Sequence, residues 1–219
     1  MSHEEHDHFQ NPSRLFIWTH LLASKVFFRS YYNELIRHLH LQGNEIVLDF
    51  GCGLGVLGGK IADKVRDSGS VTCLDVSPAM IDQSKKRLRG KKNVSLHLGD
   101  IRDVQFPKET FDYIVSTWAI HHIPKDILEE SISKLVTSLK PGGSIFVIEF
   151  PNSQQEQHQD HSLKEEDLID VFTKFGFNHE ILFQKKHGVL FKFYLVVTDN
   201  QYITEHFSQE SEISLDSSA

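Results

Sequence analysis

LDFGCGLGVLGG, residues 48–59, joins the end of an apolar run to a stretch dominated by glycine. Glycine weakens both helices and strands, because its backbone loses the most conformational freedom on folding. A chain accepts this cost where a parallel strand must turn sharply into a helix and where a ligand approaches the backbone closely. Gly51, Gly53 and Gly55 are therefore the candidates to face a ligand. The glycines at 58–59 are expected to let the following helix pack closely on the sheet.

Strand and helix patterns alternate from Glu45 onward at the spacing typical of βα units. The expected strands are 45–50, 70–75, 94–98, 111–117, 144–150, about 180–185 and about 189–197, and the expected helices are 56–65, 78–88, 124–139 and 163–175. The segment KPGG at 140–143 predicts a turn before the fifth strand. The last two strands flank a short turn, which indicates an antiparallel hairpin. The alternation predicts an α/β fold, with a mostly parallel sheet and helices on both faces.

The two ends of the chain differ from this repeating body. Apolar residues recur with a helical period over residues 15–39, which predicts one or two amphipathic helices after a short disordered start. Residues 199–219 contain acidic residues but no Lys or Arg, a composition typical of a solvated, disordered tail. We therefore expect an N-terminal helical segment at 1–43, a central domain at 44–198 and a tail at 199–219.

The composition narrows the class of protein. A formal net charge of −7 and a pI near 6.0 argue against a broad surface for nucleic-acid phosphates. The 14 histidines are scattered without metal-ligand spacing, so no metal site is expected. Cys52 and Cys73 lie in separate apolar segments and are expected to be free thiols. Neither a secretory signal nor an apolar stretch long enough to span a bilayer is visible, so we expect a cytoplasmic protein.

Three acidic residues end or follow predicted strands. Asp49 lies at the end of the first strand, Asp75 closes the second and Asp100 follows the third. The carboxyl ends of parallel strands share one edge, where ligands of open α/β folds bind. A carboxylate at Asp75 can accept hydrogen bonds from both hydroxyls of a ribose, and one at Asp100 can accept from an exocyclic amine. Val56 stands where the dinucleotide fingerprint has Gly or Ala, so the pattern departs from a dinucleotide site.

Four segments together resemble the successive motifs of class I S-adenosylmethionine-dependent methyltransferases. They are VLDFGCGLG (47–55), VTCLDVSPAMI (71–81), LGDIRDVQFPKETFDYIVSTWAIHHI (98–123) and LKPGGSIFVIEF (139–150). The likeness covers about residues 44–197 and is greatest to the branch of ubiquinone, menaquinone and small-molecule methyltransferases. It implies a Rossmann-like sheet of seven strands ending in an antiparallel hairpin. It also implies S-adenosylmethionine as cofactor and S-adenosylhomocysteine as product.

The resemblance further implies which residues hold the cofactor. It puts the methionine part at the first strand end and the glycine turn, the ribose at the second strand end, and the adenine after the third strand. The floor between cofactor and acceptor would follow the fourth strand. The residues implied are Asp49, Gly51, Cys52, Gly53, Leu54, Gly55, Asp75, Val76, Met80, Gly99, Asp100, Ile101, Ser116, Thr117 and Trp118.

The acceptor side is expected to lie after the fourth and fifth strands. His121 is the first candidate for a general base, because it follows the fourth strand and histidine titrates near neutrality. Glu149, at the end of the fifth strand, is the second candidate. Adjacent histidines before a helix can equally serve to shape the turn. The residues expected to line the acceptor pocket are Trp18, Tyr31, Tyr32, His121, His122 and Glu149.

The function expected from these features is methyl transfer to a small-molecule acceptor. Residues 15–39 could form a lid, touch a membrane surface or simply pack on the sheet. A lipid or quinone methyltransferase acting at a membrane surface and a non-catalytic adenosine-ligand binder are therefore alternatives, and a dinucleotide-dependent oxidoreductase is a third. A nucleic-acid substrate is not expected, because STWAIHH (116–122) stands where an Asn/Asp-Pro-Pro-aromatic motif would follow the fourth strand. The oligomeric state stays open.

Overall fold

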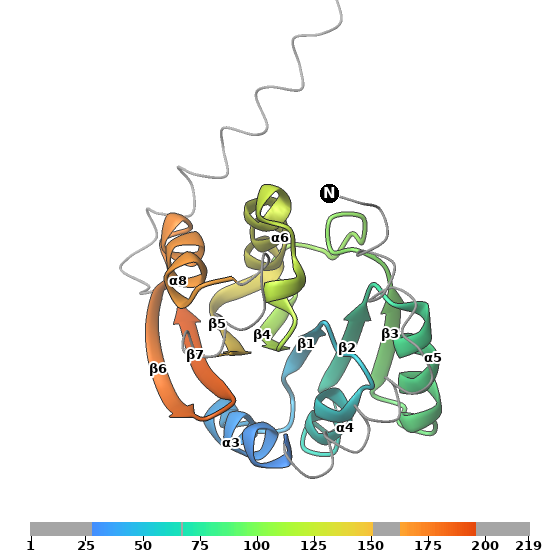
Figure 1. Cartoon of the computed structure of the whole chain (residues 1–219). Helices are drawn as coiled ribbons and strands as arrows, with labels where there is room; N and C mark the ends of the chain where they lie inside the picture. Colours follow the sequence, from blue (N-terminus) through green and yellow to red (C-terminus); the bar gives the residue numbers. More distant parts are fainter. Residues whose placement is uncertain (1–27, 67, 151–162, 196–219) are drawn as a thin grey trace, which may run out of the picture.

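A computed structural model describes residues 28–66, 68–150 and 163–195 of the chain. Within them, one sheet has the strand order β3-β2-β1-β4-β5-β7-β6 (Figure 1). Neighbouring strands from β3 to β5 run parallel, whereas β7 is antiparallel to both β5 and β6. The predicted α/β fold, with a seven-stranded, mostly parallel sheet and a C-terminal antiparallel hairpin, is therefore confirmed.

The elements follow the predicted order closely. The strands are β1 (Ile46–Phe50), β2 (Ser70–Asp75), β3 (Val94–Leu98), β4 (Phe111–Thr117), β5 (Leu139–Glu149), β6 (Asn178–Lys185) and β7 (Gly188–Tyr194). The helices are α3 (Arg29–Leu39), α4 (Val56–Ala62), α5 (Pro78–Arg87), α6 (Lys125–Ser138) and α8 (Glu165–Lys174), with a 3-10 turn η1 (Ile120–His122) before α6. The predicted helices at 15–39 are described only from α3, and the tail at 199–219 lies outside the described residues.

The start of β5 differs from the prediction. A turn was expected at 140–143, but β5 already begins at Leu139, which pairs with Phe111 of β4. The register between the two strands then shifts before the regular pairing starts at Tyr113 and Ser144. Gly142 takes the left-handed φ of 78° within this irregular stretch. The turn residues are thus built into the strand as an irregularity, which pairing with β4 stabilises.

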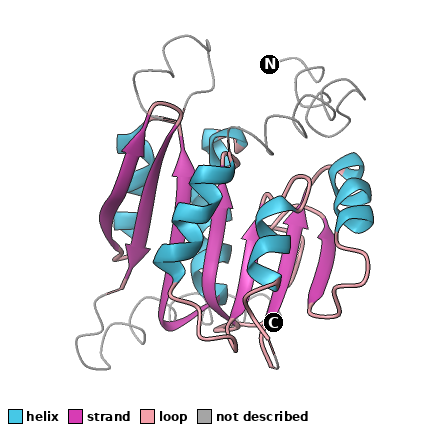
Figure 2. Cartoon of the chain, turned by 90° about the horizontal axis from the view of Figure 1, so that it is seen from below, coloured by secondary structure: helices cyan, strands magenta, loops and turns pink. Residues whose placement is uncertain are grey.

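Helices cover both faces of the sheet. In Figure 1, α6 and α8 lie on one face and α3, α4 and α5 on the other, and Figure 2 shows helices in front of and behind the strands. Side chains of β5 alternate between the two cores: Ile145 and Val147 pack on the α6 and α8 side, Phe146 and Ile148 on the α3 and α4 side. All four are at most 1% exposed, as expected of a central strand with both faces buried.

Local chemistry fixes the two helices nearest the glycine stretch. Pro78 occupies the first turn of α5, and the Ser77 hydroxyl accepts from the backbone N–H of Met80 as an N-cap. Gly55, with φ of 68°, precedes α4 and lets the chain turn directly from the loop after β1 into that helix. In the described residues, no helix combines the length and the apolar content needed to cross a bilayer.

Candidate functional site

The carboxyl ends of β2, β1 and β4 lie side by side, because these neighbouring strands run parallel in register. The chain order reverses between β1 and β4, since β2 and β3 extend the sheet to one side and β4 and β5 to the other. Ligands of open α/β folds bind outside such a reversal point. Asp49, Asp75 and Ser116 therefore come to the same edge from different parts of the sequence.

Asp49 is a buried carboxylate with one oxygen left over. It is 1% exposed, and its Oδ2 accepts a 2.8 Å hydrogen bond from the backbone N–H of Gly58. Its Oδ1 has no hydrogen-bond partner, nor has the Ser116 hydroxyl; these are the buried side-chain atoms without one among the described residues. Burial raises the pKa of Asp49 to about 7. A buried, unpartnered carboxylate oxygen is costly, so this position is prepared for a donor that a ligand brings.

The glycine loop divides into packing positions and one open position. Gly51, Gly53 and Gly55 all take left-handed φ values, of 67°, 52° and 68°. A Cβ at Gly51 would lie 2.3 Å from the Cβ of Ala119, and one at Gly55 would lie 2.9 Å from Leu88. A Cβ at Gly53 would meet nothing within 4 Å. Of the three expected ligand-facing glycines, Gly53 has the open space, and the other two are in contact with protein.

The two glycines of α4 serve packing, as expected. A Cβ at Gly58 would lie 2.6 Å from the sulfur of Cys73 and 2.9 Å from Oδ2 of Asp49. A Cβ at Gly59 would lie 2.9 Å from Leu88, just beyond α5. The absence of side chains therefore lets the start of α4 approach the Asp49 carboxylate closely enough for the Gly58 hydrogen bond. Cys52 and Cys73 are both buried free thiols.

Hydrogen bonds hold the open glycine from both sides. The Gly53 N–H donates to Oδ2 of Asp75 over 2.7 Å, and the Gly53 carbonyl accepts from the Ser84 hydroxyl over 2.7 Å. Arg87, one turn further along α5, donates to the Leu54 carbonyl over 2.9 Å. Ser84 and Arg87 were missed by sequence reasoning; their spacing on one face of a helix after the glycine loop is the signal that was available.

Asp75 joins the loop to the second strand end. Its Oδ1 accepts from the Ser77 N–H over 2.9 Å, in addition to the bond from Gly53. Burial raises the pKa of Asp75, and both backbone hydrogen bonds oppose that shift. An ionised carboxylate has about four acceptor positions, so two remain for ligand hydroxyls.

Asp100 lies in a more exposed place beside an apolar surface. Arg102 binds it with two side-chain hydrogen bonds, of 3.0 and 2.9 Å, and this pairing lowers the pKa of Asp100. Val76 and Leu98 are 47% and 52% exposed, and Leu98 pairs with Asp75 in the β2–β3 register. Two exposed apolar side chains at this edge can cover a flat, apolar group such as a purine.

Other predicted cofactor residues are more buried. Met80 and Cys52 are below 10% exposed, and Ile101 and Leu54 are each 3% exposed within the protein core. Gly99 donates its N–H to the Asp75 carbonyl and thereby ties the loop after β3 to β2. These residues shape the edge of the site, whereas Gly53, Val76 and Leu98 have the exposed surface. Arg102 and Leu98 were not anticipated.

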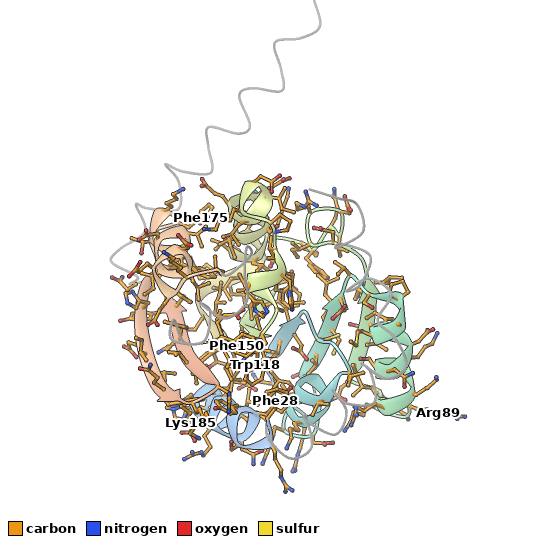
Figure 3. All side chains as sticks on the ribbon, in the orientation of Figure 1. Phe28, Arg89, Trp118, Phe150, Phe175 and Lys185 are labelled. Atoms are coloured by element: carbon orange, nitrogen blue, oxygen red, sulfur yellow. The ribbon has the colours of Figure 1, made fainter. Side chains whose placement is uncertain are left out.

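The segment after β4 builds an aromatic cluster. Trp118 takes the left-handed φ of 50°, which is uncommon for a residue with a side chain. Its ring lies 4.4 Å from that of Phe28, 5.4 Å from Tyr31 and 6.0 Å from Tyr32, measured between centroids. Phe150 lies 6.3 Å away, and Figure 3 shows Phe28, Trp118 and Phe150 grouped beside α3. We call Phe28, Tyr31, Tyr32, Trp118 and Phe150 the aromatic cluster.

Hydrogen bonds fix this cluster to the sheet and to the C-terminal hairpin. The Trp118 backbone N–H donates to the Ile148 carbonyl over 2.7 Å. The Trp118 indole N–H donates to the His187 carbonyl, and the His187 N–H donates to the Tyr31 hydroxyl. Burial, followed by the nearby Asp49 charge, raises the pKa of Tyr32, and a hydrogen bond with the side chain of Thr117 opposes this. Trp18, also expected in the acceptor pocket, lies outside the described residues.

His121 and Glu149 are in direct contact. Nδ1 of His121 lies 2.6 Å from Oε2 of Glu149, which is 3% exposed at the end of β5. Oε1 of Glu149 accepts from the backbone N–H groups of Ile120 and His121 over 2.9 and 3.3 Å. The His122 ring lies 3.9 Å from that of His121. The two residues predicted as alternative bases are thus joined in one pair.

The geometry fits S-adenosylmethionine at this edge. That molecule carries an ammonium group and a sulfonium, and the unpartnered oxygen of Asp49 offers a negative charge beside the open space at Gly53. Asp75 keeps acceptor positions for ribose hydroxyls, and the exposed Val76 and Leu98 suit an adenine. No three His, Cys, Asp or Glu side chains of the described ranges are grouped so that they could hold a metal ion.

Comparison with known proteins agrees with this assignment. The family model described as "Methyltransferase domain" matches residues 47–143. A demethylmenaquinone methyltransferase from Symbiobacterium thermophilum is 29% identical over 122 residues, 54% of this chain and 48% of that protein. An aklanonic acid methyltransferase from a Streptomyces strain is 32% identical over 103 residues, 46% of each chain. The chain therefore spans about half the length of these curated relatives.

A solved structure has the same fold over most of the chain. The methyltransferase from Aquifex aeolicus, described as dependent on S-adenosylmethionine, superposes with a TM-score of 0.68 at 16% identity, covering 90% of this chain and 100% of that one. The strand order, the family match at 47–143 and the named relatives agree with one another. The chain belongs to the class I S-adenosylmethionine-dependent methyltransferases.

Proposed function

We propose that this protein transfers a methyl group from S-adenosylmethionine to a small-molecule acceptor. The observation that carries the proposal is the buried Oδ1 of Asp49, which has no partner in the protein and faces the side of the sheet where the glycine loop leaves open space. When bound, S-adenosylmethionine supplies a methyl group that is already activated by a positive sulfur. The protein therefore has to bind, align and shield the two reactants.

The residues of the chain divide this work. Asp49 and Asp75 bind cationic and hydroxyl groups, and Ser84 holds the Gly53 peptide so that the loop is already in its binding shape. The aromatic cluster excludes water from the space next to the carboxyl end of β4. Alignment of two reactants of this kind can contribute roughly 7 to 11 kcal/mol to the lowering of the barrier.

A quinone-type acceptor is the variant that the relatives favour. One similar protein is named as a demethylmenaquinone methyltransferase and another as a ubiquinone/menaquinone C-methyltransferase. The aromatic cluster of this chain suits a flat, apolar acceptor. Co-sedimentation of the full chain with liposomes tests whether such an acceptor is taken from a membrane surface. Protein that stays in the supernatant at every lipid composition would indicate that the acceptor arrives from solution.

Calorimetry tests the cofactor assignment directly. We expect S-adenosylhomocysteine to bind and NAD not to bind, and we expect Asp75→Ala to weaken binding by about 10- to 100-fold, because it removes the acceptors for ribose hydroxyls and the Gly53 N–H. Asp126→Ala, an exposed carboxylate on α6, is the control and should bind normally. Binding of NAD in place of S-adenosylhomocysteine would favour the oxidoreductase instead.

A labelled-methyl assay then separates an enzyme from a non-catalytic binder. Extracts divided into lipid, small-molecule, protein and RNA fractions are incubated with the protein and methyl-labelled S-adenosylmethionine. We expect label in the small-molecule or lipid fraction. Tight binding of the cofactor without label in any fraction would instead support the non-catalytic adenosine-ligand binder.

A further inference from the structure

The His121–Glu149 pair is a second polar group at the carboxyl edge, separate from the residues assigned to the cofactor. Glu149 ends β5, and His121 follows β4, so the parallel pairing of these two strands brings residues 28 positions apart into contact. The 2.6 Å separation between Nδ1 and Oε2 is that of a strong, charge-assisted hydrogen bond. A buried carboxylate that contacts an imidazole fixes which ring nitrogen carries the proton.

The hydrogen bonds to Glu149 define that proton. Its Oε1 already accepts from the backbone N–H groups of Ile120 and His121. An ionised carboxylate only accepts, so Nδ1 of His121 must be the donor to Oε2. The other ring nitrogen, Nε2, is then left with a lone pair on the opposite side of the ring. The His121 side chain is 18% exposed, so a ligand can reach it.

The surroundings of the imidazole are aromatic. The Phe150 ring meets that of His121 edge-on at 5.3 Å, and Phe150 in turn lies 6.3 Å from Trp118. The titratable groups that face the His121 ring in the described part of the chain are Glu149, from β5, and His122, from its own turn. An acceptor that reaches Nε2 therefore lies against aromatic side chains, which favour flat rings.

We propose that His121 is the general base of the reaction, that Glu149 is its positioning residue, and that the acceptor is an aromatic hydroxyl compound which must lose a proton. This inference rests on the proposed methyl transfer. The acceptor O–H proton moves to Nε2 of His121, and the electrons left on the acceptor form its new bond to the methyl carbon. The electron pair of the broken S–C bond stays on the sulfur, which becomes a neutral thioether. The imidazolium formed is balanced by the Glu149 carboxylate.

Two variants separate this role from simple shaping of the turn. His121→Ala removes the base. Glu149→Gln keeps the size of the side chain, and its amide N–H can donate to Nδ1, which would put the proton on Nε2 and remove its lone pair. His38→Ala is the matched control, because His38 also faces a glutamate, Glu34, at 3.7 Å, but on the outer surface of α3.

The assay uses 1,4-naphthalenediol under nitrogen as the probe acceptor, with methyl-labelled S-adenosylmethionine, from pH 6 to pH 10. At pH 7 we expect His121→Ala and Glu149→Gln to lower turnover by about 10²- to 10⁴-fold. Calorimetric binding of S-adenosylhomocysteine should change by less than about twofold in both. Turnover by His121→Ala should rise about tenfold per pH unit until the probe is ionised, because hydroxide then replaces the base.

A measurement without turnover tests the tautomer. In ¹⁵N-labelled wild-type protein, imidazole chemical shifts should identify a His121 protonated at Nδ1 near pH 7.5, and in Glu149→Gln the proton should move to Nε2. Normal turnover by Glu149→Gln at every pH, or a His121 protonated at Nε2 in the wild type, would overturn the proposal. If the wild type methylates only acceptors without an acidic proton, such as thioethers, the proposed function stands and this inference fails. If the wild type binds no S-adenosylhomocysteine, the proposed function itself fails.

Discussion

Gly51→Ala is expected to destabilise the protein strongly, and Gly53→Ala only moderately. Both residues take left-handed φ values, so a Cβ costs about 1 to 2 kcal/mol at either position. At Gly51 the new Cβ would also lie 2.3 Å from the Cβ of Ala119, whereas at Gly53 it would meet nothing within 4 Å. The overlap with Ala119 should add about 1 to 3 kcal/mol. Urea unfolding of the two variants measures the difference.

The clash has a specific partner, which allows a rescue. In the double variant Gly51→Ala with Ala119→Gly, the overlapping methyl group is gone, so the added loss should be largely recovered. A double-mutant cycle should therefore give a coupling energy of about 1 to 3 kcal/mol between the two positions. Equal destabilisation by Gly51→Ala and Gly53→Ala, or a coupling energy near zero, would show that Gly51 does not pack against Ala119.

Binding should follow the opposite order. Gly53 is the glycine beside open space, so Gly53→Ala should weaken binding of S-adenosylhomocysteine by about tenfold, or about 1.4 kcal/mol. Gly51→Ala should bind nearly normally at temperatures where it is folded. This separation of a stability effect from a binding effect was not available from the sequence, in which the two glycines occupy equivalent places in the loop.

Most of the fold could be predicted because its signals are local. The predicted limits of β2, β3 and β4 agree with the structure to the residue, since each strand is a continuous apolar or alternating run that ends at a turn. The early start of β5 could not be predicted in this way. Leu139 joins the sheet only because Phe111, far away in the chain, is its partner. The local residues KPGG indicate a turn, and strand pairing overrides that preference.

The candidate site was predicted in its members but not in their contacts. His121 and Glu149 were each expected at the carboxyl edge, but their hydrogen bond depends on the pairing of β4 with β5. The pairing of Asp100 with Arg102 is local, at a separation of two residues, and could have been suggested from the sequence. The left-handed conformation of Trp118 has no sequence signal, because such a φ is disfavoured for a large side chain and is held by tertiary contacts.

Asp49→Asn is expected to stabilise the protein in a manner that depends on pH. Burial raises the pKa of Asp49 from 3.8 to about 7 in the folded state. The folded protein therefore binds the proton more tightly than the unfolded chain, and the stability of the wild type falls as the pH rises from about 4 to about 7. Asparagine does not titrate, so the variant lacks this loss. The difference in free energy of unfolding between variant and wild type should grow by roughly 4 kcal/mol over that range and then stay constant.

Thermal unfolding at several pH values measures this difference. For a chain of this size, 1 kcal/mol corresponds to about 2 to 4 °C in melting temperature, so the advantage of the variant should be about 8 to 16 °C larger at pH 8 than at pH 4. Asp63→Asn, at a side chain that is 68% exposed, is the control and should give a difference that is nearly independent of pH. A pH-independent difference for Asp49→Asn would mean that Asp49 is not held in the buried, half-partnered state described above.

The same substitution should weaken the site that the buried charge serves. Without the carboxylate, the open position at Oδ1 no longer attracts an ammonium group, and we expect S-adenosylhomocysteine to bind about 10- to 100-fold more weakly at pH 8. In the wild type, affinity should fall by up to about tenfold per pH unit below pH 7, because Asp49 must lose its proton before it can pair with a cation. The variant should lack this dependence. Unchanged affinity in Asp49→Asn, or wild-type affinity that is constant from pH 5.5 to pH 8, would separate the buried charge from cofactor binding and leave it as a strand-end cap that hydrogen-bonds Gly58.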